Sequence, residues 1–390
     1  MIYLDYAATA PLTATACKAM GDCFKPGTDA LFGNANSVHT AGRTAFKALE
    51  RARESVMRSI GAGRPDEVIF TSGATEADNA ALRGIALARR DALSLEGKHI
   101  DHPAIIVSAI EHDAVLETCA ALKREGFAIT VLPVDAGGFV SPESLEKAIS
   151  DETVLVSIMF ANNEIGSIQS IEALAQTAHA HGVPFHTDAV QAFGKIPCSV
   201  SSLGVDAASF SAHKAGGPKG VGVLYLKAGT PFKPTMTGGG QERGFRSGTQ
   251  NIAGAIGCAA AFEEAAARCD EENRRLMHLR DGLYRELGNM PEVKASVDVS
   301  PGSQSYLPNI VNVCVRGFES QTLILQLDLR GFCVSGGSAC SSGSLAPSHV
   351  LTAISIPRNL AQGSLRISMG SDTTPEELER FVSTFKEIIR

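Results

Sequence analysis

Short apolar runs alternate with longer amphipathic segments over much of this chain, between about residues 66 and 226. The apolar runs are 67–71, 104–107, 129–132, 154–160, 183–186, a short run ending at Phe210, and 221–226. Each run has the length and composition of a buried strand. Strands that alternate with helical segments are typical of a mainly parallel sheet with crossover helices. The pattern therefore predicts an α/β fold with a large, seven-stranded type of sheet.

The segments between these runs predict helices. Apolar positions recur with helical spacing over 113–125 and 171–181. Ser141 followed by Pro142 is typical of the first turn of another helix. Each predicted helix lies between two predicted strands, as a crossover connection requires.

The pattern changes at about residue 255. A charged helix through 263–287 is followed by a shorter mixture of strands and helices, with a last helix over 375–389. We expect this part to form a smaller α+β domain, with the charges of the long helix on a solvated face. The predicted organisation has three parts: an N-terminal segment packed with the small domain (1–15), a large domain (16–255) and the small domain (256–390).

Composition excludes several classes of protein. The chain has 390 residues, 44% of them hydrophobic, and a net charge of −7 without a basic run, so we expect a large core and no nucleic-acid partner. The N-terminal residues lack a secretory pattern, and no apolar run is long enough for a membrane span. We therefore expect a cytoplasmic protein without a membrane partner. Nine scattered cysteines without a C-x-x-C pair argue against a disulfide framework or a structural zinc.

Polar residues follow five of the predicted strands. Ligands of parallel sheets bind beyond the carboxyl ends of the strands, so residues at these positions are candidates for chemistry. The five groups are 72–75, 111–112, 162–164, Asp188 and 211–214. We expect one site to collect them.

Asp188 and Lys214 together predict a site for pyridoxal 5'-phosphate. The carbonyl of this cofactor needs a lysine amine for a Schiff base, and its ring nitrogen needs a carboxylate partner to stay protonated. A carboxylate after a buried strand is costly unless it is paired, and a desolvated lysine has a lowered pKa. Either residue alone would be read as a structural aspartate or a surface lysine. Lys219 is excluded as the Schiff-base lysine because it lies in a glycine-rich turn, away from the strand end.

Four neighbouring residues are candidates for the cofactor phosphate. Ala74 and Thr75 lead from a strand into a helix, where backbone N–H groups and the Thr75 hydroxyl could hold an anion. Simple helix capping is the alternative there. Ser211 and His213 flank the lysine and could add phosphate contacts.

Four further residues are candidates for the cofactor ring and the substrate. Gln191 could donate to the phenolic oxygen of the ring, and His112 could lie against the ring and shuttle protons. Arg366, in an alternating strand, could bind a substrate carboxylate with two hydrogen bonds, and Asn163 could supply another. The simpler alternatives are an ordinary histidine at 112 and an exposed strand arginine at 366.

Cys340 lies in a run rich in glycine and serine, over 335–344. Such a run predicts an exposed, mobile loop, and a thiol there suggests a nucleophile that must travel. An incidental loop cysteine is the alternative. No residue is assigned to a resident metal, and Cys340 is the one candidate for a transient iron–sulfur ligand.

In order and combination these residues resemble the cysteine desulfurases of the class V aminotransferase group, in particular the nitrogen-fixation and iron–sulfur-cluster subgroup. The resemblance covers nearly the whole chain. Its motifs are 3–9 (YLDYAAT), 71–76 (TSGATE), 111–112 (EH), 162–166 (NNEIG), Asp188, Lys214, 243–249 (RGFRSGT), 337–340 (GSAC) and Arg366.

The resemblance implies a homodimer of the fold-type I pyridoxal phosphate class that acts on L-cysteine. Lys214 would be the Schiff-base lysine, with His112 on the ring, Asp188 and Gln191 at its edge, and a large domain that binds the cofactor. The phosphate would be held by Thr75, Ser211 and His213, and by Thr249 of the neighbouring subunit. Asn163 and Arg366 would hold the substrate carboxylate. Cys340 would take the sulfur as a persulfide, leaving alanine, and pass it to an acceptor such as an iron–sulfur scaffold.

Two features depart from many relatives: Ala215 to Gly217 replace a bulkier segment, and the chain ends soon after its last helix, without the longer tail that some members use toward scaffold partners. The acceptor is therefore left open. A selenocysteine lyase or another class V aminotransferase is the nearest alternative, and a catalytically silent sulfur-relay or scaffold protein is a more distant one. Cys340 favours sulfur transfer over transamination, which needs no thiol.

Overall fold

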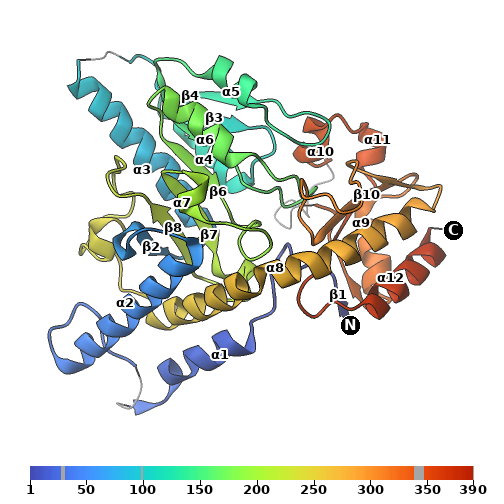
Figure 1. Cartoon of the computed structure of the whole chain (residues 1–390), viewed down its shortest axis with the longest axis horizontal. Coiled ribbons are helices and arrows are strands. Elements are labelled where there is room, and N and C mark those ends of the chain that lie inside the picture. Colours follow the sequence, from blue (N-terminus) through green and yellow to red (C-terminus); the bar gives the residue numbers. More distant parts are fainter. Residues whose placement is uncertain (28–30, 98–99, 338–346, 390) are drawn as a thin grey trace.

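A twisted, mainly parallel sheet forms the centre of the larger part of the molecule (Figure 1). The computed structural model describes residues 1–27, 31–97, 100–337 and 347–389. Within these residues the sheet has seven strands in the order β2-β8-β7-β6-β5-β3-β4. Their bounds are β2 Val68–Thr71, β3 Ala104–Ser108, β4 Ala128–Leu132, β5 Thr153–Ser157, β6 Phe185–Asp188, β7 Ala207–Ser211 and β8 Gly222–Leu226. β8 runs antiparallel to both of its neighbours, and the other pairs are parallel.

Helices cover both faces of this sheet. α3 and α4 pack on one face against side chains such as Ile105 and Val107, whereas α2, α5, α6 and the first half of α8 pack on the other against Ile106. Because successive strand residues point to opposite faces, burial on both faces explains why the strands are continuous apolar runs. The helices are α1 Ala14–Gly21, α2 Thr40–Ile60, α3 Ala74–Leu95, α4 Asp113–Arg124, α5 Pro142–Ala148, α6 Ile171–Ala180 and α7 Val200–Leu203.

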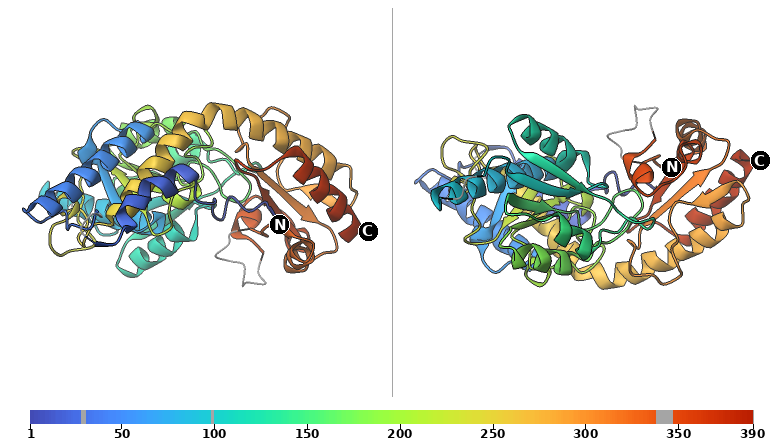
Figure 2. Two further views of the ribbon diagram at one scale, coloured as in Figure 1. Left: turned by 90° about the horizontal axis from the view of Figure 1, so that it is seen from below. Right: turned by 90° about the horizontal axis from the view of Figure 1, so that it is seen from above.

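The long helix α8, Ile252–Gly288, runs from the larger part to the smaller part (Figures 1 and 2). The smaller part contains a three-stranded sheet in the order β12-β10-β9 and a separate apolar core to which the second half of α8 contributes. Its elements are β9 Val293–Ala295, β10 Ile310–Val315, α9 Ser320–Asp328, β11 Phe332–Cys333, α10 His349–Ala353, α11 Arg358–Ala361, β12 Ser364–Ser368 and α12 Pro375–Ile388.

The N-terminus lies against this smaller part. β1, Ile2–Tyr3, pairs in parallel with β11, and Ile2 and Leu4 belong to the same apolar core as α12. Further along the segment, Ala10 N and Thr13 N donate to His213 O and Gly216 O of the larger part. The grouping of residues 1–15 with the small domain and the domain boundaries stay a prediction. Short 3₁₀ turns occupy η1 Asp22–Phe24, η3 Pro65–Glu67, η4 Ala212–Lys214 and η5 Glu242–Gly244.

The predicted α/β architecture is confirmed, with local differences. Asp188 and Ser211 are the last residues of their strands rather than the first residues after them. The long helix begins at Ile252, before the charged segment from which it was predicted, because its first turns are apolar and pack on the larger part.

Candidate active site

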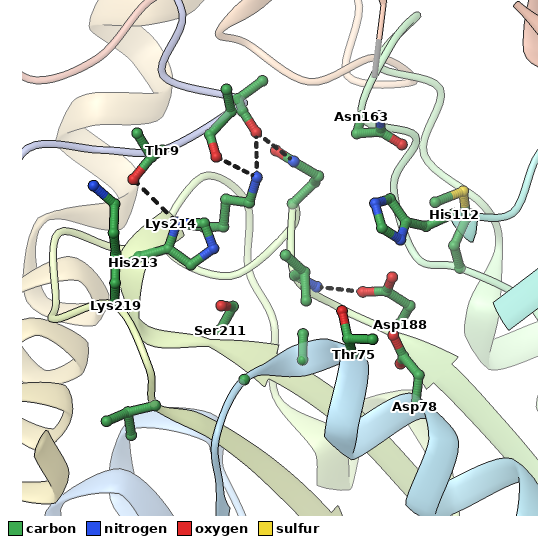
Figure 3. A pocket seen from close by; sticks show the side chains of 18 of the residues that line it. Thr9, Thr75, Asp78, His112, Asn163, Asp188, Ser211, His213, Lys214 and Lys219 are labelled. Atoms are coloured by element: carbon green, nitrogen blue, oxygen red, sulfur yellow. Dashed lines mark hydrogen bonds between the residues drawn. The ribbon is translucent and has the colours of Figure 1, made fainter. Parts of the chain in front are cut away.

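A cavity of about 510 Å³ lies at the carboxyl ends of the central strands (Figure 3). The predicted site residues that line it come from segments far apart in the sequence: Ala74, Thr75, His112, Asn163, Asp188, Gln191, Ser211, His213, Lys214 and Arg366. This is the edge of the sheet at which parallel α/β folds bind their ligands. The structure thus brings together nearly all of the side chains proposed from sequence.

One described candidate does not line the cavity, and one candidate is not described. Thr249 is exposed and lies outside it. Cys340 lies outside the described residues, so its placement relative to the cavity stays a prediction. Gly337 and Pro347 are the nearest described residues on either side of it.

The N-terminus of α3 forms one wall of the cavity. Gly73 is its N-cap and supplies no side-chain hydrogen bond, and Gly73, Ala74 and Thr75 all line the cavity. A helix begins with backbone N–H groups that have no partner within the helix, which makes its N-terminus a site for an anion. Gly222 of β8 lies directly behind this turn, because a Cβ there would come within 2.4 Å of the Gly73 carbonyl carbon. The close backbone contact fixes the position of the turn.

Asp188 is a buried carboxyl group at the end of β6. Its Oδ1 accepts a hydrogen bond from Val190 N at 2.9 Å, and its side chain lines the cavity. Burial raises its pKa above the ordinary value, while the positive charges of His112 and Lys214 and the Val190 hydrogen bond act in the opposite direction. A cationic N–H group placed in the cavity would stabilise its ionised form further.

Lys214 follows β7 in the short turn η4. Its Nζ donates to the carbonyl oxygens of Ala7 and Ala8, at 2.6 and 2.7 Å, so the N-terminal segment reaches into the site (Figure 3). Beside it, His213 Nδ1 is 3.0 Å from Thr9 Oγ1. Burial and the neighbouring charge of Lys214 lower the pKa of His213 to about 4, so this imidazole is neutral at pH 7.

Lys219 also lines the cavity, which contradicts the reason for excluding it. The glycine-rich turn after Lys214 folds back, so a residue five positions further on reaches the same space (Figure 3). Lys219 is exposed, whereas Lys214 is partly buried and hydrogen-bonded. The two amines therefore differ in solvation rather than in access to the cavity.

His112 and Gln191 have defined hydrogen bonds. His112 caps α4, with its Nδ1 accepting from Ala114 N at 3.0 Å. This bond leaves the proton of a neutral ring on Nε2, the nitrogen that is free to exchange protons with a ligand. Gln191 Nε2 donates to Ala7 O at 3.0 Å, the same carbonyl that Lys214 contacts.

Arg366 lies in β12 and is 1% exposed, so the interpretation as an exposed strand arginine is wrong. Its Nη1 donates to Asn163 O at 2.8 Å and its Nη2 to Asp5 Oδ1 at 2.9 Å. The buried Nε has no hydrogen-bond partner among the described residues. An unpaired buried donor is costly, and Arg366 lines the cavity, so its guanidinium is a candidate to bind a carboxylate there.

Sequence reasoning missed a buried polar layer beneath Asp188. Asp78 of α3 is 1% exposed, lines the cavity and has Oδ1 3.7 Å from His186 Nε2. Burial, followed by the nearby charge of Asp188, raises the pKa of Asp78 well above its ordinary value. Burial lowers the pKa of His186 to about 3, so the histidine is neutral and Asp78 has no cationic partner in it. No local pattern at either position indicates this contact, because Asp78 lies among other polar residues at the start of a helix and His186 lies within a strand.

Glu111 and Asp5 are further residues that the residue-by-residue reasoning missed. Glu111 is fully buried, and both of its carboxyl oxygens accept from Met159 N, at 2.9 and 3.1 Å. One sequence signal was available for each residue: Glu111 follows a predicted strand directly, and Asp5 lies in the N-terminal motif 3–9. Neither signal indicates which residue Glu111 or Asp5 contacts.

The described part of the chain contains no group of three or more histidine, cysteine or acidic side chains able to hold a metal ion. It also contains no helix with both the length and the apolar character needed to cross a membrane.

Comparisons with known proteins agree with this geometry. The family model described as aminotransferase class-V matches residues 2–381. Cysteine desulfurase IscS of Dictyoglomus turgidum is 48% identical over 389 residues, covering 100% of this chain and 94% of that protein. A solved NifS-like protein is 37% identical with a TM-score of 0.89, covering 100% of this chain and 99% of its own. A structure of SspA in complex with cysteine is 32% identical with a TM-score of 0.78, over 95% and 99% of the two chains. The chain therefore belongs to the class V aminotransferase family.

Proposed function

We propose that this protein is a pyridoxal phosphate-dependent cysteine desulfurase, which converts L-cysteine to L-alanine and leaves the sulfur on Cys340. The observation that carries the proposal is the convergence of Lys214, Asp188 and the N-terminus of α3 on one cavity. Its similarity over the full chain to proteins named cysteine desulfurase supports the choice of reaction within the family.

The residues of the cavity fit this cofactor. The N-cap turn at Gly73, with Thr75 and Ser211, offers donors for a phosphate, and a Cβ at Gly73 would meet no atom within 4 Å, so the turn has open space in front of it. Asp188 offers a buried carboxylate for a protonated ring nitrogen, and Lys214 offers the amine for the covalent link. When bound, pyridoxal phosphate supplies an electron sink for bonds at the substrate carbon atoms.

Arg366 and Asn163 would hold the substrate carboxylate. The unpartnered Nε of Arg366 gives the guanidinium a free donor, while its Nη atoms are fixed by Asp5 and Asn163. A guanidinium held on one edge can bind a carboxylate on the other without losing much rotamer freedom. The related SspA structure was described in complex with cysteine, which agrees with a site of this kind.

His112 would move protons during the reaction. Its Nδ1 accepts from the backbone of α4, so the Nε2–H group is the one that would give a proton and take it back. The cap also prevents the ring from turning, which keeps Nε2 toward the cavity.

Cys340 would be the sulfur acceptor. Its Sγ would attack the substrate sulfur, so that an S–S bond forms as the substrate Cβ–S bond breaks. The electron pair of the broken bond stays with the carbon, which takes up a proton and becomes alanine, and this balances the proton lost by the Cys340 thiol. The persulfide would then pass to an acceptor, such as an iron–sulfur scaffold.

The proposal includes a homodimer, with Thr249 completing the phosphate site of the partner subunit. Its support is that Thr249 is exposed outside its own cavity. Large apolar side chains at Phe24, Phe32 and Phe46 are also exposed, at 69%, 60% and 50%, as expected of a protein interface.

The proposal also places the enzyme in the cytoplasm, where reduced thiols persist, since the eight described cysteines are all free. The domain division at residues 15 and 255 belongs to the same proposal.

The test is to incubate the purified protein with pyridoxal phosphate and L-cysteine and to measure alanine and protein-bound persulfide together. We expect equal early amounts of both, with the persulfide located on Cys340 by mass spectrometry. Cys340→Ala should keep the yellow absorbance of the bound cofactor and lose the persulfide. Alanine formation that continues in this variant at the wild-type rate would rule out the proposed reaction.

A further inference from the structure

Glu164 lies beside both ends of the segment that contains Cys340 and is hydrogen-bonded to one of them. On one side, Ser348 Oγ donates to Glu164 Oε2 at 2.6 Å. On the other, Gly337 lies so close that a Cβ there would come within 3.1 Å of the same oxygen. Gly337 is the last described residue before 338–346, and Ser348 is the second after it. One carboxyl group therefore lies next to two points that are eleven residues apart in the chain.

Glu164 is itself held firmly. It is 1% exposed, its N donates to Asn162 Oδ1 at 2.8 Å, and its O accepts from Asn312 Nδ2 at 3.1 Å. Asn312 is on β10 of the smaller part, so the backbone of Glu164 is tied to both parts of the molecule. A side chain on such a backbone has little freedom to follow a neighbour that moves.

The same region is tied to the proposed carboxylate site. Asn163, the residue before Glu164, accepts from Arg366 Nη1 at 2.8 Å. Ser335 and Arg366 exchange backbone hydrogen bonds of 3.2 and 2.6 Å, and Ser364 Oγ donates to Gly336 O. The first end of the segment thus lies on the strand that carries Arg366. The second end has its side-chain contact to Glu164.

We propose that Glu164 is a positioning residue for sulfur transfer to Cys340, because it holds Ser348, just after the 338–346 segment, beside Gly337, just before it, and next to Asn163 and the strand of Arg366. The inference rests on the proposed function and adds a residue to it. The step concerned is the one in which the Cys340 S–S bond forms as the substrate Cβ–S bond breaks. Glu164 does not touch the reacting atoms in this account.

A positioning role predicts that cysteine binding and sulfur transfer respond differently to a change at Glu164. A purely structural role would affect both steps. The binding of cysteine depends on Arg366 and Asn163, which keep their own hydrogen bonds when the Glu164 side chain changes. Delivery of the thiol depends on where the ends of its segment lie. Weakening the hydrogen bond to this charged group should lower the population of the arrangement that it favours about tenfold. We therefore expect the loss in sulfur transfer and not in substrate binding.

The test compares Glu164→Gln, Ser348→Ala and Thr352→Ala with the wild type. Gln has nearly the shape of Glu but offers the Ser348 hydroxyl a neutral acceptor in place of a charged one, so Glu164→Gln weakens the contact. Ser348→Ala removes the contact from the other side, which covers a folding defect in the first variant. Thr352→Ala is the matched control: its Oγ1 donates to Ser348 O at 2.9 Å, and it does not touch Glu164. Ser348 Oγ also accepts from Val350 N and Leu351 N and so caps α10. Hydrogen exchange of these two amides therefore reports a change in the position of Ser348 without any reaction.

Rapid mixing with cysteine gives both steps in one experiment. The change in cofactor absorbance reports substrate binding, and alkylation with mass spectrometry reports persulfide on Cys340. We expect Glu164→Gln to bind cysteine within twofold of wild type, to form the persulfide about tenfold more slowly, and to exchange the Val350 and Leu351 amides faster. Ser348→Ala should agree, and Thr352→Ala should behave as wild type.

Persulfide formation in Glu164→Gln and Ser348→Ala at the wild-type rate would overturn the inference, and a second such result is an equal loss in binding and in transfer. The second result would place Glu164 in the carboxylate site. An equal defect in Thr352→Ala would mean that any disturbance of α10 has this effect, and would also overturn it. If the wild type itself forms no persulfide on Cys340, the proposed function fails instead.

Discussion

Arg366 and Asp5 form an ion pair at the edge of the cavity, with 2.9 Å between Nη2 and Oδ1, although they are 361 residues apart in the sequence. The guanidinium is 1% exposed, and its other Nη donates to the backbone of Asn163. The pair therefore connects the N-terminal segment, the strand β12 and the loop after β5. It leaves Nε as the donor without a partner in the described structure.

Asp5→Ala should weaken substrate binding more than turnover. Removal of the carboxylate leaves Arg366 with one fixed Nη atom, so the guanidinium loses part of its orientation. We expect KM for cysteine to rise about tenfold and kcat to change by less than about threefold, which is the signature of lost binding common to substrate and transition state. Steady-state kinetics of alanine formation measure both quantities.

The control is Tyr3→Phe, which removes the hydroxyl that donates to Asp5 O at 3.0 Å and leaves the ion pair in place. Its KM should stay within twofold of wild type. An unchanged KM in Asp5→Ala would mean that the orientation of Arg366 does not depend on this pair.

Lys214 and Lys219 both reach the cavity, and the two amines should give opposite results on mutation. Lys214→Ala should lose the yellow absorbance of the covalently bound cofactor and lower alanine formation by at least about a hundredfold, as for loss of a group that acts on the reacting atoms. Lys219→Ala should keep the absorbance and most of the activity, since the side chain is exposed. Absorbance spectra of both variants at equal cofactor content are the measurement. Persistence of the band in Lys214→Ala would assign the link to another lysine.

The sequence was sufficient to predict the strands and the groups at their ends. Asp188 and Ser211 end β6 and β7, where the apolar runs placed them within one or two residues. This succeeds because both the strand and its ligand-bearing end are local in sequence. The same reasoning predicted one site from five separate segments.

Contacts between distant segments could not be predicted in this way. The pairing of Asp5 with Arg366 depends on how β1 is placed beside β11 and β12, which no local pattern specifies. Lys219 was misplaced for a related reason, because its distance along the chain from β7 did not reveal that the glycine turn folds back. The antiparallel direction of β8 and the buried layer of Asp78 and His186 likewise follow from tertiary packing.

Glu111 should make stability fall as pH rises. Burial raises its pKa from 4.5 to about 8, against the hydrogen bonds from Ser108 and Met159. Between these two pH values the folded protein keeps the proton and the unfolded chain releases it, so the free energy of unfolding decreases with pH, by up to about 1.4 kcal/mol per unit. Below 4.5 and above about 8 the group contributes no pH dependence.

Glu111→Gln removes this titration. The difference in unfolding free energy between variant and wild type should therefore shift in favour of the variant from pH 5.5 to pH 8. Urea unfolding of both proteins at the two pH values measures the shift, and other titrating groups cancel in the comparison. A difference that is the same at both pH values would show that Glu111 does not hold its proton in the folded state.

Thr249 provides a test of the proposed dimer, because it is exposed and does not line the cavity of its own chain. If it completes the partner's phosphate site, each cavity combines Lys214 of one subunit with Thr249 of the other. Thr249→Ala homodimers should then bind the cofactor about tenfold more weakly, as for loss of a hydrogen bond to a charged group, and Lys214→Ala homodimers should be inactive.

A heterodimer of the Thr249→Ala and Lys214→Ala subunits has one cavity with both residues intact and one with neither. Co-expressed and separately tagged subunits should therefore regain about half of the wild-type activity, with wild-type cofactor affinity in that half. If Thr249 acts within its own chain, the heterodimer cavity that keeps Lys214 will retain the weakened affinity. If Thr249 plays no part, the Thr249→Ala homodimer will bind the cofactor as the wild type does.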